Sequence, residues 1–295
     1  MTPLPEVSEM KDIQIIDIKS AAYPERLRNI PDPPGQLYCT GDVDLMKTRT
    51  IGVVGARKNT LYGKNVTLMI GRRLAESGIT VVSGLALGID AYSHEGALEA
   101  DGKVIGVLGS GIDKMGPVSN YRLMERGLEK GGLVVSEYPP DFSANRATFP
   151  KRNRIISGLS EALVVVEAGL NSGSLITAKM AADQGRQVYA VPGNINSQSS
   201  IGTNLLIRDG ATPLVIIDDL IRDIGADTKR SPEHMQGMDP DEEKVFEVVR
   251  MMSGATIEEI IRGTGFSPQL VGSIITVMEI KGIVESYAGR IYSSQ

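Results

Sequence analysis

Six short runs of β-branched and other apolar residues alternate with stretches of helical periodicity through the middle of the chain. They cover residues 51–55, 79–84, 103–109, 132–137, 162–168 and 186–193. Strands that are apolar on both faces and separated by helices are typical of a parallel sheet covered on both sides. The alternation therefore predicts an α/β fold, an extended Rossmann-like, doubly wound and mostly parallel sheet, over residues 49–224.

The pattern changes on either side of this region. Residues 1–48 are rich in proline and less periodic, which predicts a lead-in segment laid on the core. Residues 225–240 form a polar stretch without periodicity, which predicts a linker. Residues 241–295 show three short helical patterns followed by a hairpin pattern with Gly289 at its turn. Three helices and a two-stranded wing predict a small C-terminal winged-helix domain.

Targeting signals are lacking in the sequence as it stands. No apolar run approaches the roughly 18 residues needed to cross a bilayer, and the start lacks the basic-then-apolar plan of a signal peptide. A single cysteine, Cys39, excludes an internal disulfide framework and fits a reducing compartment. We predict a cytoplasmic protein with no membrane partner.

The net charge of −5 argues weakly against a nucleic-acid ligand, since proteins that bind nucleic acid often carry a basic excess. Charges act locally, however, because the Debye length is only about 8 Å at physiological salt. One segment does concentrate cations. Residues 146–154 contain four of them and no acid: Arg146, Lys151, Arg152 and Arg154, together with Phe149 and Asn153.

Interleaving an aromatic ring with cations is how single strands are held, since bases stack on the ring and guanidinium groups bind phosphates. The alternative is a solvated loop with Phe149 anchored in the core, and from this segment alone the two interpretations stand about even.

The turn at residues 52–64 joins a strand to a helix. It is not a P-loop, because Lys58 stands where the first glycine should be and Asn65 replaces the magnesium-binding Ser or Thr. Gly55, Arg57 and Lys58 nevertheless lie at the carboxyl end of a strand, where the amides of the next helix could share an anion. We therefore predict a phosphate-binding role for this turn.

Two further loops beyond strand ends are small and polar. One contains Ser172, Gly173 and Ser174 at the start of a helix, and the other contains Gly193. Such residues form anion cradles at helix N-termini, although they are also good N-caps with no further role. Together with the basic segment they favour a binding cleft.

Catalytic constellations are missing from the sequence. Asp90 and His94 lie four residues apart on one helical face, but no second His or Cys is near to complete a metal set, so helix capping is the better interpretation. A Ser-His-Asp set is implausible with one histidine in the core, and no HExxH or CxxC occurs. We predict no catalytic residues, no metal and no cofactor.

Seven segments lie in this order within about residues 20–217: YPERLRNIPDPPGQLYCTGD, GVVGARKNTLYG, SGLALGIDAYSHEGAL, SEYPP, FPKRNRIISGLS, VVVEAGLNSGSLITAKMAADQGRQVYAVPG and SIGTNLLIRDGA. Together they resemble the DprA/Smf family of DNA-processing proteins. The resemblance implies a homodimer that binds single-stranded DNA and loads the RecA recombinase in natural transformation and DNA recombination. By analogy Arg57 binds phosphate, Arg146 and Arg152 meet the strand, and Phe149 stacks on a base.

The predicted DNA-binding set therefore comprises Gly55, Arg57, Lys58, Arg146, Phe149, Lys151, Arg152, Asn153, Ser172, Gly173, Ser174 and Gly193. The alternative is a nucleotide-binding enzyme related to phosphoribohydrolases that act on nucleoside monophosphates. Those enzymes rely on a PGGxGT-type phosphate loop, and the equivalent position here contains NSGSLITA.

The C-terminal segment carries eight acids against five cations from residue 240 onwards. Its third helical pattern, the candidate recognition helix, has no cation before Lys281. A winged helix that reads a major groove should be basic there. We therefore predict that this domain contacts protein or has a regulatory role.

Overall fold

A computed structural model describes residues 12–226, 238–252, 254–281, 283–287 and 289–293. The chain divides into two compact units, residues 1–229 and 230–295, each with its own core.

The larger unit is built on a nine-stranded sheet with the order β1-β2-β6-β5-β4-β3-β7-β8-β9. All pairs from β6 through β9 are parallel, whereas β1 pairs with β2, and β2 with β6, in antiparallel fashion. This confirms the predicted Rossmann-like α/β fold with a mostly parallel sheet. The strands are β1 (Gln14–Asp17), β2 (Gln36–Gly41), β3 (Thr50–Val54), β4 (Thr80–Ser83), β5 (Val104–Leu108), β6 (Leu133–Ser136), β7 (Ala162–Val165), β8 (Gln187–Ala190) and β9 (Thr212–Pro213).

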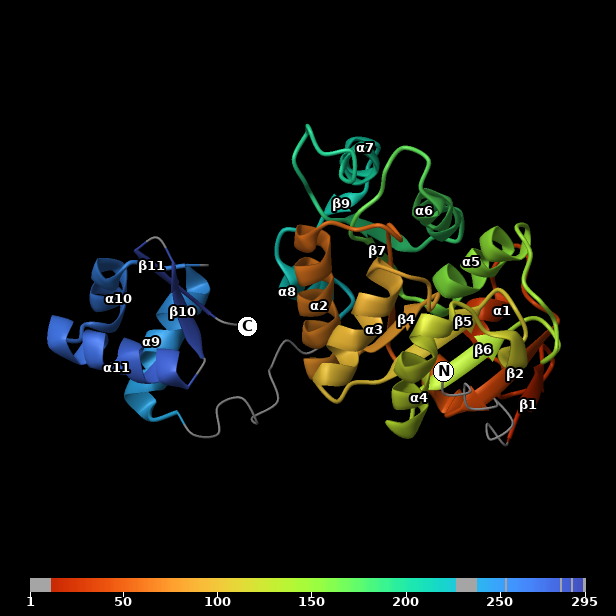
Figure 1. Ribbon diagram of the computed structural model, residues 1–295, viewed down its shortest axis with the longest axis horizontal. Coiled ribbons are helices and arrows are strands. Elements are labelled where there is room, and N and C mark those ends of the chain that lie inside the picture. The colour runs from red at the N-terminus through yellow and green to blue at the C-terminus, as the bar shows by residue number, and fades with distance from the viewer. Residues whose placement is uncertain (1–11, 227–237, 253, 282, 288, 294–295) are drawn as a thin grey trace, which may run out of the picture. The chain divides into compact units, whose positions relative to one another are not determined.

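Helices cover both faces of this sheet (Figure 1). Along a strand successive side chains point to opposite faces, so Val53 packs in the core under α2, α3 and α8 while Val54 packs in the core under α5 and α6. The helices are α1 (Glu25–Arg28), α2 (Leu61–Glu76), α3 (Ile89–Glu99), α4 (Tyr121–Glu129), α5 (Thr148–Leu159), α6 (Gly173–Asp183), α7 (Ile201–Arg208) and α8 (Ile217–Asp223), with short 3-10 turns η2 (Val43–Lys47), η3 (Ile112–Lys114) and η4 (Val118–Asn120).

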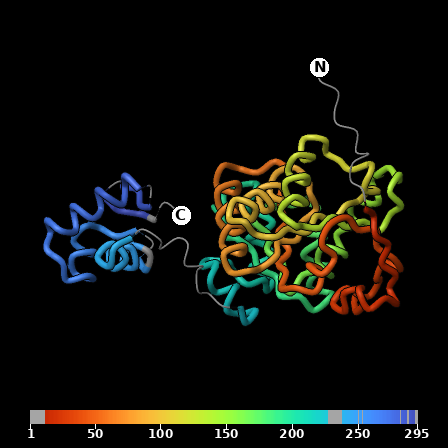
Figure 2. The backbone as a smooth tube through the Cα atoms, turned by 90° about the horizontal axis from the view of Figure 1, so that it is seen from below, coloured from red at the N-terminus to blue at the C-terminus, as the bar shows by residue number. Residues whose placement is uncertain are grey.

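Part of the N-terminal segment belongs to the sheet itself. The sequence separated residues 1–48 from the core, whereas β1 and β2 continue the sheet beyond β6 and α1 packs against α5. In Figure 2 this red segment lies directly against the rest of the unit. The sequence signal was weak because these antiparallel strands are short and β1 is exposed at three of its four residues.

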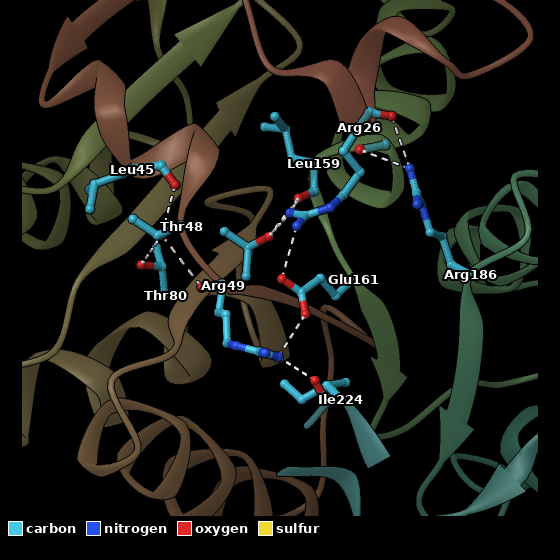
Figure 3. Close-up of polar contacts among 11 residues, drawn as sticks. Arg26, Leu45, Thr48, Arg49, Thr80, Leu159, Glu161, Arg186 and Ile224 are labelled. Atoms are coloured by element: carbon cyan, nitrogen blue, oxygen red, sulfur yellow. Dashed lines mark hydrogen bonds and ion pairs between the residues drawn. The ribbon is translucent and has the colours of Figure 1, made fainter. Parts of the chain in front are cut away.

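A polar network joins the amino ends of the central strands (Figure 3). Glu161, just before β7, accepts hydrogen bonds from Arg26 Nη2 at 2.8 Å and from Arg49 Nη1 at 3.3 Å. Arg49 also donates to the carbonyl of Ile224, and Arg186 Nη2 donates to the carbonyl of Arg26 at 2.9 Å. The network therefore fastens α1, α8 and the start of β3 together at the amino ends of the strands.

The smaller unit consists of α9 (Pro240–Met251), α10 (Ile257–Thr264) and α11 (Pro268–Ile280), followed by the antiparallel pair β10 (Val284–Tyr287) and β11 (Arg290–Ser293). Thr256 and Glu259 form a capping box at the start of α10, and Ser267 caps α11. Residues 227–237, most of the predicted linker, lie outside the described residues.

Candidate functional site

A cavity of about 710 Å³ opens at the carboxyl ends of β3 and β7. These strands are neighbours in the sheet but are separated in sequence, since the chain continues from β3 to β4 on one side and reaches β8 from β7 on the other. Such a switch point is where open α/β sheets bind their ligands. The wall is formed by Val54, Gly55, Ala56, Arg57, Lys58, Ala86, Asp90, Arg146, Phe149, Pro150, Arg152, Asn153, Ile156, Gly169, Asn171, Ser172, Gly173, Ser174, Ile176 and Thr177.

The predicted binding residues gather at this cavity, with two exceptions. Ten of the twelve belong to its wall, and Lys151 and Gly193 do not. The sequence left open whether residues 146–154 were a loop, and most of them form the first turns of α5 instead. Phe149, Arg152, Asn153 and Ile156 follow the spacing of one helical face, which explains why they line the cavity together.

Arg57 and Phe149 of this wall are in contact. The guanidinium carbon of Arg57 lies 5.4 Å from the centre of the Phe149 ring, a cation–π contact. Arg57 is exposed and Phe149 is half-buried. One face of the ring is therefore already covered by a cation, and a stacked base would share the platform with Arg57.

Arg152 is held inside the protein rather than presented on its surface. Its side chain is 4% exposed, and Nη1 donates to the carbonyl of Gly84 at 2.6 Å and to that of Val107. Burial lowers the pKa of Arg152 to about 10, which still leaves it charged at neutral pH. It can attract an anion from the floor of the cavity while its Nη1 stays bonded to the ends of β4 and β5.

The other two cations of the segment pair with acids. Lys151 Nζ lies 3.4 Å from Glu137 Oε1, and Arg154 donates to Asp32 at 2.9 Å and to Glu137. They lie three residues apart on a different face of α5 from Phe149 and Arg152. Counting cations along the sequence therefore overestimated the charge that reaches the cavity.

Two helix N-termini lie near the cavity and differ in whether their hydrogen-bond donors already have a partner in the protein. At α2 the amide and hydroxyl of Thr60 donate to the buried carboxylate of Glu167, at 2.9 and 2.6 Å. The sequence predicted that amides at this end of the helix would share a bound anion with Arg57. At Thr60 the carboxylate of Glu167 already accepts these hydrogen bonds. Sequence reasoning missed Glu167, whose signal was one acid directly after the apolar run of β7.

The N-terminus of α6 faces the cavity instead. Ser172, Gly173 and Ser174 line the wall, and the first turn carries no acid. The Ser172 and Ser174 hydroxyls are 2.7 Å apart, and Ser172 Oγ accepts a long bond of 3.4 Å from the Ser174 amide. A helix N-terminus with hydroxyl donors and without an acid suits a phosphate oxygen.

Gly193 has a local explanation in the structure. Its amide donates to Asn204 Oδ1 at 3.2 Å and its carbonyl accepts from Asn204 Nδ2 at 2.9 Å. A Cβ at this position would lie 2.2 Å from Ser200 Oγ. The close packing of its own loop therefore accounts for a glycine at this position.

The described residues do not meet the requirements for a metal site or for a membrane-spanning helix. They contain no group of three or more His, Cys, Asp or Glu side chains placed to hold a metal ion. None of the described helices has the length and apolar composition needed to span a bilayer.

Fold and site together define a class: a Rossmann-like α/β protein with a cavity lined by cations at its topological switch point. A sequence profile described as DNA recombination-mediator protein A matches residues 14–225, and the chain belongs to this family.

Two curated relatives show how far the likeness extends. Protein Smf of Escherichia coli is 42% identical over 203 residues, which are 69% of this chain and 54% of that protein. DNA processing protein DprA of Bacillus subtilis is 41% identical over 213 residues, or 72% of this chain and 71% of that protein. The chain thus spans only about half the length of the first of these relatives.

Two solved structures resemble the larger unit. DNA processing protein A from Streptococcus pneumoniae has a TM-score of 0.68 and 37% identity, covering 73% of this chain and 76% of that one. DNA processing protein A from Helicobacter pylori, described for its single-stranded DNA binding mode, has a TM-score of 0.64 and 31% identity, covering 72% and 95%.

Proposed function

We propose that the protein binds single-stranded DNA in the cavity at the β3–β7 switch point, as a non-catalytic mediator of DNA recombination and transformation. The observation that carries the proposal is the cavity wall itself. It combines the Arg57–Phe149 platform with Lys58 and Arg146 and with the hydroxyl-rich start of α6. Cations that track the backbone beside an aromatic ring suit a flexible strand whose base faces are free.

Family membership supports the same reading. The matched profile is that of a recombination mediator, and the Helicobacter pylori relative is a single-strand binder. The alternative of a nucleotide-cleaving enzyme is not favoured by these likenesses. A direct comparison tests it: nucleoside monophosphates incubated with the protein should stay intact while short oligonucleotides bind.

The wider role is proposed from the family resemblance. We propose that the protein acts in the cytoplasm, dimerises and loads a RecA-type recombinase onto the bound strand. A dimer is compatible with the sheet edge at β9, where the adjoining Val215 and Ile216 are 76% and 56% exposed. Light scattering measures the dimer, and strand-exchange assays with a recombinase measure the loading.

We also propose that residues 241–295 form a winged-helix domain that contacts protein rather than DNA. On α11 the exposed side chains include Leu270, Val277 and Ile280. Lys281 at its end lies 2.8 Å from Glu242, so this cation is already paired with an acid. A helix face that exposes apolar side chains and no free cation suits a protein surface better than a DNA groove.

The test of the central proposal is binding of a labelled oligonucleotide at several salt concentrations. Affinity should fall steeply with salt, log K decreasing by roughly 0.7 per phosphate neutralised on a single strand. Single strands should bind more tightly than blunt duplex of the same length, because stacking needs exposed base faces. Equal affinity for the duplex would contradict the proposal.

A further inference from the structure

Asp90 introduces an acidic side chain into a wall that is otherwise basic. Among the described residues that line the cavity it alone carries a carboxyl group, and the charged residues around it are Arg57, Lys58, Arg146 and Arg152. It lies in the first turn of α3 and is 7% exposed. An ionised carboxyl group in this place would repel a phosphate. Its position in a cavity proposed to bind phosphate therefore needs an explanation.

The carboxylate is tied to Arg152 through one residue, Gly84. The Gly84 amide donates to Asp90 Oδ2 at 3.1 Å, while the Gly84 carbonyl accepts from Arg152 Nη1 at 2.6 Å. A Cβ on residue 84 would lie 2.3 Å from that same Nη1, so the arrangement requires a glycine. None of the ion pairs between described residues includes Asp90, and Arg152 Nε is buried without a hydrogen-bond partner. The acid and the guanidinium therefore share a backbone link without forming a direct pair.

Burial is the main influence on this carboxyl group and raises the pKa of Asp90 above its ordinary value. Arg152, the amides of Gly84 and Ala86, and Arg57 act in the opposite direction. Among the elements packed against α3, α2 places Lys64 over the ring of Tyr92. His94, one turn further along α3, has its pKa lowered to about 4 by burial and is neutral near pH 7. The two arginines are thus the cations that act on Asp90.

We propose that Asp90 determines the affinity of the cavity for a phosphodiester strand, weakening binding when it is ionised, and that it takes up a proton from solvent when the strand binds. This inference rests on the proposed function. A bound phosphate places a second negative charge in the same cavity, which makes ionisation of the carboxyl group less favourable. Linkage is reciprocal: if strand binding favours protonation of Asp90, then protonation of Asp90 must raise the affinity for the strand by the same factor.

The experiment compares the wild type with Asp90→Asn. Asparagine keeps the shape and can still accept the Gly84 amide through Oδ1, but it carries no charge. Affinity for oligothymidylate, whose bases do not titrate in this range, is measured by fluorescence anisotropy from about pH 5.5 to about pH 8.5, above the ordinary carboxyl range. The matched control is Asp101→Asn, which removes an exposed acid just beyond α3 and outside the cavity.

Wild-type affinity should fall as the pH rises, while Asp90→Asn should lose most of this dependence. The two curves should converge at the acidic end and differ by about tenfold at the alkaline end, as expected for one unit charge within a Debye length of a phosphate. Calorimetry in buffers of different ionisation enthalpy should show proton uptake on binding for the wild type and much less for Asp90→Asn. Asp101→Asn should follow the wild type.

Parallel curves, or weaker binding by a folded Asp90→Asn protein at every pH, would overturn the inference. Arg57→Ala, measured alongside, separates this failure from a failure of the proposed function. If Arg57→Ala binds normally, the cavity is not the DNA site. If Arg57→Ala binds weakly and Asp90→Asn matches the wild type, the cavity binds DNA and only the role of Asp90 is wrong.

Discussion

The guanidinium group of Arg57 lies over the ring of Phe149, 5.4 Å from its centre. The two residues come from the turn after β3 and from the first turn of α5, far apart in the sequence. This contact holds an exposed arginine of the cavity wall against its aromatic ring. It also makes the effects of the two side chains on binding interdependent, because each one positions the other.

Arg57→Ala and Phe149→Ala should weaken single-strand binding in different ways. Loss of Arg57 removes a charge-assisted phosphate contact of roughly 1.5–3 kcal/mol and should reduce the salt slope. Loss of Phe149 should cost about 1–3 kcal/mol with a slope near that of the wild type, because stacking releases no counterions. The double variant should lose less than the sum, as residues in contact are seldom additive.

Thermal melts must accompany these binding data, because Phe149 is half-buried. A Phe→Ala change in a core typically costs about 3–5 kcal/mol of stability. If Phe149→Ala melts much earlier but binds normally at low temperature, the ring is a core anchor and not a stacking platform.

Arg146 and Lys151 provide a matched pair of cations within one segment. Arg146 lines the cavity, whereas Lys151 lies outside it and pairs with Glu137. Arg146→Ala should therefore lower affinity and the salt slope, and Lys151→Ala should change both by little, because Lys151 lies outside the cavity wall and Glu137 already offsets its charge. Filter-binding titrations at two salt concentrations measure both. A larger loss for Lys151→Ala would show that the strand runs along the other face of α5.

Deletion of residues 241–295 should leave single-strand affinity largely intact. The segment carries more acids than cations, and the larger unit, which holds the whole cavity, has a separate core. Gel shifts of the truncated protein measure this, with circular dichroism as the check on folding. A large loss of affinity in a folded truncated protein would mean that the charge count misled us about this domain.

His94 should make the stability of the larger unit depend on pH. Burial lowers its pKa to about 4, below the ordinary value of 6.5, so the unfolded chain binds the proton more readily than the folded one. The contribution of neutral His94 to the free energy of unfolding is fully present above pH 6.5. It is lost as the pH falls from 6.5 towards 4, by about 3 kcal/mol in all. Urea unfolding of the wild type and of His94→Gln at several pH values measures how the free energy of unfolding of each protein changes with pH. If the free energy of unfolding depended on pH equally in both proteins, His94 would not be the cause of the pH dependence.

The sequence by itself determined the sheet and the edge that carries the site. Strand identity follows from short β-branched runs, and the parallel arrangement follows from the helices between them; both are local patterns. Because the carboxyl ends of parallel strands meet at one edge, the Arg57 turn, the Phe149 segment and the Ser172 loop could be assigned to a common site in advance. The helical spacing of Phe149, Arg152 and Ile156 is also present in the sequence, but the cations and the proline among them are equally typical of a loop.

Only the tertiary structure decided which charges face the cavity. Arg154 and Lys151 are paired with Glu137, and the start of α2 is closed by Glu167, partners that come from other parts of the chain. Arg152 is buried on carbonyls of two strands, and Asp90 joins the wall through Gly84. Backbone preferences are local and can be recognised along the chain. An ion pair forms instead between residues that packing brings within a few ångströms, so its partner cannot be identified until the chain has folded.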